Sequence, residues 1–128
     1  ASDVYKRQDN RRAAEEAKAL SGNDFPQFLK LVKESGDSSA KWLQNLYSCS
    51  KPAEQGIPLG LWASEQILGD AGVSRVHGGG FGGTVQAYVP DDMVGYFKRE
   101  SEKLLGDGRC HILKIRRHGC AEIGGSYE

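Results

Sequence analysis

Residues 73 to 89 read Val73-Ser-Arg-Val-His-Gly-Gly-Gly-Phe-Gly-Gly-Thr-Val-Gln-Ala-Tyr-Val89, and this stretch decides the fold. On either side of the glycines, apolar and polar residues alternate with the period of two that is typical of a half-buried strand. The pattern predicts one strand over Val73–His77 and a second over Thr84–Val89. The glycine-rich segment Gly78–Gly83 would then connect the two strands of an antiparallel hairpin.

Helical patterns precede this hairpin. Apolar residues recur at spacings of three and four, and glycine, proline and capping residues separate the segments. Four helices are expected, over Asp9–Gly22, over Asp24–Gly36, from a cap at Ser38 or Ser39 to Tyr47, and, after a loop at Cys49–Pro58, over Leu59–Leu68.

The pattern after the hairpin predicts a further helix and further strands. Pro90-Asp91 opens a helix with Val94, Phe97 and Leu104 on one face. Cys110–Ile115 is expected to be a third strand, and Cys120–Ile123 a weak fourth one. The fold class is therefore α+β, with helices on one face of an antiparallel sheet and an N-terminal helical layer. This order is compatible with a ferredoxin-like domain.

The first eight residues do not share the helical pattern that begins at Asp9. They carry no apolar period and join that pattern abruptly, so they are expected to be non-native or disordered. The predicted domain is residues 9–128, and the chain is interpreted as part of a longer protein.

The composition is that of an ordinary globular domain. In 128 residues the chain has 17 Lys and Arg and 17 Asp and Glu, so its formal net charge is zero. Such a balance argues against a nucleic-acid or membrane partner, because both favour a basic face. The spacing of Cys49, Cys110 and Cys120 matches no common zinc site, and no metal site is expected.

Five of the six positions in Gly78–Gly83 are glycine, which is more than a hairpin turn requires. The segment fits GxGxxG, but a strand comes next where a dinucleotide fold needs a helix. It lacks the lysine of a phosphate loop, and the GxxG of RNA-binding KH domains joins two helices. A wide turn with no other role stays open as an interpretation.

The stretch Arg75–Thr84 resembles the third signature motif of galactokinases, within the GHMP family of small-molecule kinases. The resemblance covers Asp9 to Gly119 and is to clostridial-type members of the family. Further parts of the chain that resemble it are Asp9-Asn10-x-Arg12, Tyr47–Leu59, Val85–Pro90 and Ile115-Arg116. It implies the GHMP kinase C-terminal domain as the fold.

The resemblance also implies a function. Galactokinases transfer the γ-phosphoryl group of ATP, with Mg²⁺, to the anomeric hydroxyl of galactose in the cytoplasm. In the family, the sugar-binding motif, the phosphate-binding motif and the catalytic Asp lie upstream of the region that this chain covers. The chain alone is therefore expected to hold no catalytic residue and to need the N-terminal GHMP domain of the same protein as its partner.

The site that the resemblance implies is a glycine loop beside the substrate and nucleotide. Its expected members are Gly78, Gly79, Gly80, Phe81, Gly82 and Gly83, with Arg75 and His77 as flanking contacts. A structural role for Arg75 and His77 is the favoured interpretation, because isolated charges usually serve the fold. Two other functions stay open: another GHMP sugar kinase, and a stand-alone α+β module that binds a small ligand or RNA.

Overall fold

The computed structural model describes residues 2–81 and 83–115. Its elements are α1 (Ser2–Ser21), α2 (Phe25–Leu43), α3 (Gly56–Leu68), β1 (Val73–Val76), β2 (Val85–Tyr88), the short 3₁₀ helix η1 (Asp91–Met93) and α4 (Val94–Leu105). The chain is thus α+β, as predicted.

The two strands form an antiparallel hairpin in which Val76 lies opposite Val85 and Val73 lies opposite Tyr88. Alternate side chains point to opposite faces of the hairpin. The face with Tyr88 meets α2, where the ring of Phe28 packs edge-on at 5.4 Å between centroids. The other face carries Val85, which approaches Gly60 of α3.

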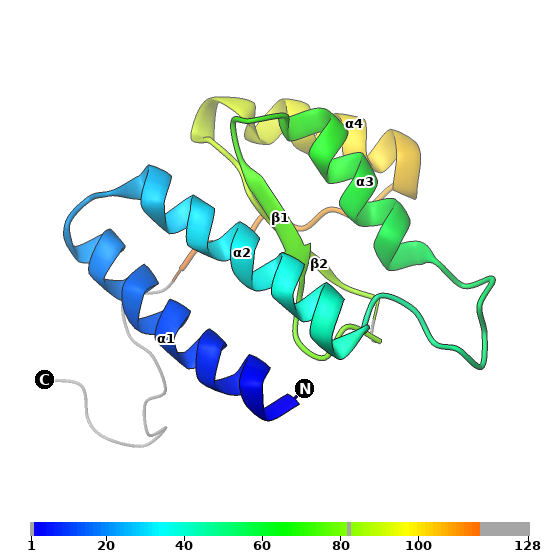
Figure 1. Ribbon diagram of the computed structural model, residues 1–128. Coiled ribbons are helices and arrows are strands. Elements are labelled where there is room, and N and C mark those ends of the chain that lie inside the picture. The colour runs from blue at the N-terminus through cyan, green and yellow to red at the C-terminus, as the bar shows by residue number, and fades with distance from the viewer. Residues whose placement is uncertain (1, 82, 116–128) are drawn as a thin grey trace, which may run out of the picture.

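The hairpin therefore lies between two helical layers (Figure 1). In one layer α1 and α2 run antiparallel side by side, and in the other α4 packs on α3. The core between these layers is small and apolar. Its members include Leu31, Val32, Ile57, Ala63, Leu68, Val76 and Phe97. The N-terminal helical layer agrees with the sequence-based expectation, whereas helices cover both faces of the hairpin and not one.

Helix α2 is longer than its sequence suggests. It begins where predicted, because the Asp24 side chain accepts a hydrogen bond from the amide of Gln27 at 3.2 Å. It then continues through Gly36, which the sequence marks as a stop, and the separate helix expected from Ser38 or Ser39 to Tyr47 is wrong. A Cβ built on Gly36 would lie 2.8 Å from the Cβ of Arg75, so this glycine serves a close approach of α2 to β1.

Helix α1 begins at Ser2, seven residues before the predicted start at Asp9. Residues 2–8 are thus helical although they lack an apolar period, and the expectation that the first eight residues are non-native or disordered stays a prediction. At the other helix starts the differences are small. Helix α3 begins at Gly56 and not at Leu59, because Pro58 is tolerated in a first turn.

The third strand expected at Cys110–Ile115 is not formed in the described residues. Side chains of α4 instead engage the main chain where this segment begins. Lys98 Nζ donates to the carbonyl of Cys110 at 2.9 Å, and Glu102 Oε1 accepts from the amide of Gly108 at 3.1 Å. Desolvation alone would raise the pKa of Glu102. The hydrogen bonds that its carboxylate accepts from the amides of Cys110 and Gly108, together with the hydrogen bond and charge of Lys98, outweigh desolvation and lower the pKa. The weak strand at Cys120–Ile123 lies outside the described residues.

Candidate functional site

The glycine loop, His77–Thr84, connects β1 to β2 and is closed by two main-chain hydrogen bonds. The amide of His77 donates to the carbonyl of Thr84, and the amide of Gly83 donates to the carbonyl of Gly80, both at 3.0 Å. Gly78, Gly80 and Gly83 have φ angles of 63°, 93° and 80°. Residues with side chains rarely adopt these conformations, so the loop depends on glycine at these positions. Gly82 lies outside the described residues.

The loop glycines differ in what surrounds them. A Cβ on Gly80 would collide with the carbonyl oxygen of Asn45 and would lie 2.9 Å from the Cβ of Asn45. A Cβ on Gly78, Gly79 or Gly83 would meet nothing within 4 Å. Gly80 is therefore the point at which the loop packs against the segment after α2, whereas the other three leave space beside their main chain.

Asn45 is a buried polar residue that the sequence does not reveal. It is 2% exposed, and its Nδ2 donates to Ser39 Oγ of α2 at 3.0 Å. Its Oδ1 has no hydrogen-bond partner among the described residues. Turning the amide around would only exchange which end lacks a partner. An unsatisfied buried polar atom costs about 1–3 kcal/mol, so Asn45 is unfavourable for stability at this place.

Arg75 does not reach into the glycine loop. Its Nη1 donates to Ser35 Oγ of α2 at 2.6 Å, and Ser35 Oγ in turn donates to Asp9 Oδ1 of α1 at 2.6 Å. Its Nε donates to the carbonyl of Val76 at 3.1 Å. This chain of hydrogen bonds ties α1 and α2 to β1, which supports the structural interpretation of Arg75. The Arg75 side chain is half-buried.

Further charged groups lie around this chain of hydrogen bonds. Arg12 is 7% exposed, and its Nη1 lies 3.6 Å from Asp9 Oδ1. Burial raises the pKa of Glu16, with Asp9 acting in the same direction and with Arg75 and Arg12 opposing it. Burial also raises the pKa of the Tyr88 hydroxyl, and the negative charge of Glu16 adds to that rise. The cluster is electrostatically balanced within itself, as a structural ion-pair network is.

His77 and Phe81 lie exposed at the loop. The His77 side chain makes no hydrogen bond with the described residues. Phe81 is 66% exposed, so an aromatic ring stands at the tip of the glycine loop without a neighbouring side chain to cover it. Both residues are free to contact a ligand or another protein segment, whereas Arg75 is not.

Further large apolar side chains lie exposed near the sequence position of Asn45. Trp42 and Leu43 end α2, and Tyr47 follows Asn45 by two residues. Asn45 lies between them in the sequence and packs against Gly80, so the segment that carries these exposed residues meets the loop at Asn45. We call Trp42, Leu43, Tyr47 and Phe81 the loop-side surface.

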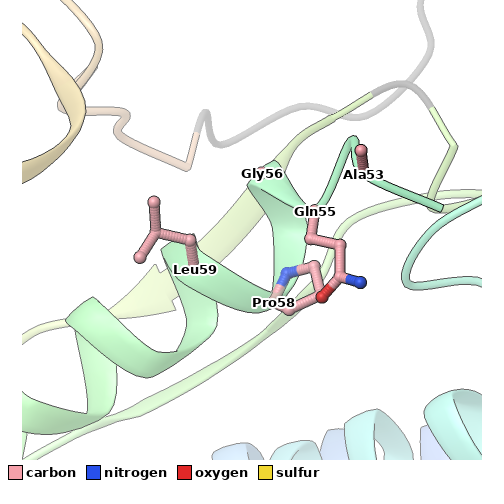
Figure 2. Close-up of a pocket in the computed structure, with 5 residues that line it drawn as sticks. All are labelled: Ala53, Gln55, Gly56, Pro58 and Leu59. Atoms are coloured by element: carbon pink, nitrogen blue, oxygen red, sulfur yellow. The ribbon is translucent and has the colours of Figure 1, made fainter. Parts of the chain in front are cut away.

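Two hollows in the described residues lie away from the glycine loop. A shallow, open pocket lies at the start of α3 and is lined by Ala53, Gln55, Gly56, Pro58 and Leu59 (Figure 2). The Nε2 of Gln55 donates to the carbonyl of Pro52, so the amide nitrogen of this side chain is already engaged. A second groove runs between the start of α2 and the end of α3, near Val73 at the end of β1 away from the loop. Neither hollow includes a glycine-loop residue.

Among residues 2–81 and 83–115, no three His, Cys, Asp or Glu side chains lie where they could share a metal ion. Cys49 and Cys110 are free thiols. A group of three such ligands is therefore absent from the part of the chain that the structure describes. In the same part, no helix is both long enough and apolar enough to cross a bilayer.

Comparison of the chain with protein-family models, with curated proteins and with solved structures finds no match in any of the three.

Proposed function

We propose that this chain is the C-terminal portion of a galactokinase and that its glycine loop forms one wall of a sugar-phosphorylating site. The observation that carries the proposal is the stretch Arg75–Thr84, in sequence and in geometry. Its glycines combine left-handed backbone at Gly78, Gly80 and Gly83 with a close approach to Asn45. A plain turn requires neither so many glycines nor the contact.

The proposed reaction moves the γ-phosphoryl group of ATP to the anomeric oxygen of galactose. The O–P bond to ADP breaks, a bond from the sugar oxygen to phosphorus forms, and the sugar hydroxyl loses its proton. Phosphoryl transfer depends on positioning and on neutralising charge. In the proposal this chain helps to position the substrates, because the open main chain at Gly78, Gly79 and Gly83 allows another surface to approach closely. Mg²⁺ and the ATP phosphates would be held mainly by the other half of the enzyme.

The loop-side surface supports the proposal that a second domain of the same protein packs against this chain. Phe81 in the loop is 66% exposed, and Trp42 near the end of α2 is 43% exposed. Exposed apolar surface of this kind marks interaction sites. In the proposal the N-terminal GHMP domain covers it.

The decisive experiment recovers the reading frame upstream of Asp9 and expresses the joined protein. We expect in-frame sugar- and phosphate-binding motifs, and formation of ADP that requires galactose. ADP formation with a related hexose but not with galactose would replace the proposal by another GHMP sugar kinase. A start codon directly before Asp9 would overturn the kinase proposal and favour a stand-alone binding module.

The RNA-binding alternative receives less support from the loop. In the structure the glycine loop joins two strands, whereas a KH-type GxxG joins two helices. The segment also carries no lysine, and Arg75 is engaged by Ser35.

A further inference from the structure

We infer that Asn45 is a positioning residue that fixes the glycine loop through its contact with Gly80. The inference deepens the proposed function in one respect: the effect of Asn45 on turnover rests on that function, whereas its effect on the loop does not.

The contact between Asn45 and Gly80 is the tightest one that the described loop glycines make. The Cα of Gly80 lies so close to the Asn45 carbonyl that no Cβ fits between them. Gly80 has a φ of 93°, and the amide of Gly83 donates to its carbonyl at 3.0 Å. A shift of Asn45 would therefore displace Gly80, and with it the hydrogen bond between Gly83 and Gly80 that closes the loop.

Asn45 is itself fixed from α2. Helix α2 ends at Leu43, and Gln44 adopts a left-handed conformation with a φ of 50°, which turns the chain toward the loop. The side chain of Asn45 then donates to Ser39 Oγ, and both residues are almost fully buried, at 2% and 1% exposed. A continuous path of contacts thus runs from the buried face of α2, through Ser39 and Asn45, to Gly80.

The side-chain amide of Asn45 has opposite effects on the position of its segment and on the stability of the fold. Its amide leaves one end without a partner in the described residues, which is unfavourable for a buried group. An apolar side chain would avoid that penalty but could not donate to Ser39. The amide therefore specifies one position for the segment beside the loop, at the expense of stability.

The first test is spectroscopic and uses the 128-residue chain. Glycine-selective ¹⁵N labelling reports the loop amides in the wild type, in Asn45→Ala, in Ser39→Ala and in the control Ser64→Ala. Ser64 is also a buried hydroxyl, which donates to the carbonyl of Gly60 within α3, so its loss tests for general destabilisation.

We expect Asn45→Ala and Ser39→Ala to shift the same loop glycine signals, Gly78, Gly79, Gly80 and Gly83, and Ser64→Ala to leave them in place. The three atoms nearest to a Cβ built on Gly80 all belong to Asn45 and none to Ser39, so a shared pattern identifies the path through Asn45. Should Asn45→Ala fail to fold, Ser39→Ala still decides. Loop signals that stay unchanged in Ser39→Ala, or that move equally in Ser64→Ala, would overturn the inference.

The second test uses the joined enzyme of the proposed function. We expect Asn45→Ala to lower kcat by about 10- to 100-fold while KM for ATP changes little, since misplacement by a fraction of an ångström costs turnover. If the wild-type enzyme shows no galactose-dependent ADP formation, the proposed function fails and the spectroscopic result still decides on Asn45. If the enzyme is active and Asn45→Ala keeps its kcat, the positioning role is overturned.

Discussion

At the scale of single residues, neighbouring glycines of one loop have different physical requirements. Gly80 combines a φ of 93° with a collision between any added Cβ and the Asn45 carbonyl. Gly79, beside it, has neither a left-handed φ nor a neighbour within 4 Å of an added Cβ. The number of glycines in the loop therefore overstates how many of them the fold needs.

Gly80→Ala is expected to lower the free energy of unfolding by about 2–4 kcal/mol, because left-handed strain and overpacking both act. The matched control Gly79→Ala should stay within about 0.5 kcal/mol of the wild type. Urea unfolding followed by circular dichroism measures both. Equal losses in the two variants would contradict the contact with Asn45.

Glu16 provides a test of the charged cluster. Burial raises the pKa of Glu16 in the folded chain. At a pH between the unfolded and the folded pKa, the folded chain therefore holds a proton that the unfolded chain has already released. The contribution of this group to stability is therefore present below its unfolded pKa and is lost as the pH rises through its folded pKa. Glu16→Gln removes that loss, so the stability of the variant relative to the wild type should rise as the pH increases above the ordinary pKa of a glutamate, about 4.3.

The measurement is urea unfolding across this pH range, with Glu15→Gln as the control. Glu15 is exposed and forms an ion pair with Arg11 at 3.7 Å on the outer side of α1. A difference between Glu16→Gln and the wild type that does not change with pH would contradict the effect of partial burial on Glu16.

At the scale of the elements, a local capping signal fixes where α2 begins, whereas no local signal fixes where it ends. Asp24 caps α2 through the amide of Gln27, and Pro26 stands in the first turn, so four residues contain the whole signal. Gly36 resembles a stop signal but lies within α2, because its lack of a side chain admits Arg75 of β1. The end of α2 thus depends on a contact 39 positions away in the chain.

Asp24→Ala is expected to lower the free energy of unfolding by about 1 kcal/mol, since the amides of the first turn of α2 lose their acceptor. Asp37→Ala is the matched control, because Asp37 is exposed within the same helix and pairs with Lys33 at 3.6 Å. Removing such a surface pair should change stability by under about 0.5 kcal/mol. Thermal unfolding compares the two, and equal effects would argue against the cap.

The segment Cys110–Ile115 illustrates why a strand pattern alone is insufficient. Its apolar alternation is typical of a strand, yet Leu113 and Ile115 are 87% and 95% exposed. A strand requires a neighbour to pair with, and the hydrogen bonds from Lys98 and to Glu102 engage the beginning of the segment. Propensity is local, whereas strand pairing is not.

At the scale of the whole molecule, the proposed function divides the roles: this chain contributes the glycine loop, and the sugar-binding and phosphate-binding motifs would belong to the other half of the enzyme. The 128-residue chain alone is therefore expected to show no galactose-dependent consumption of ATP. A coupled assay for ADP, with and without galactose, measures this. Activity above a blank without protein, abolished by Gly80→Val, would show that the chain is catalytic by itself and contradict the proposed division of roles.

The sequence by itself determined the α+β class, the hairpin around Gly78–Gly83 and the start of α2. These features depend on periodicity, turn residues and caps, which act over a few neighbouring positions. Only the tertiary structure decided that α2 passes through Gly36, that Arg75 is engaged by Ser35 and that Gly80 packs on Asn45. Those contacts join residues 35 to 40 positions apart, and packing between elements selects them.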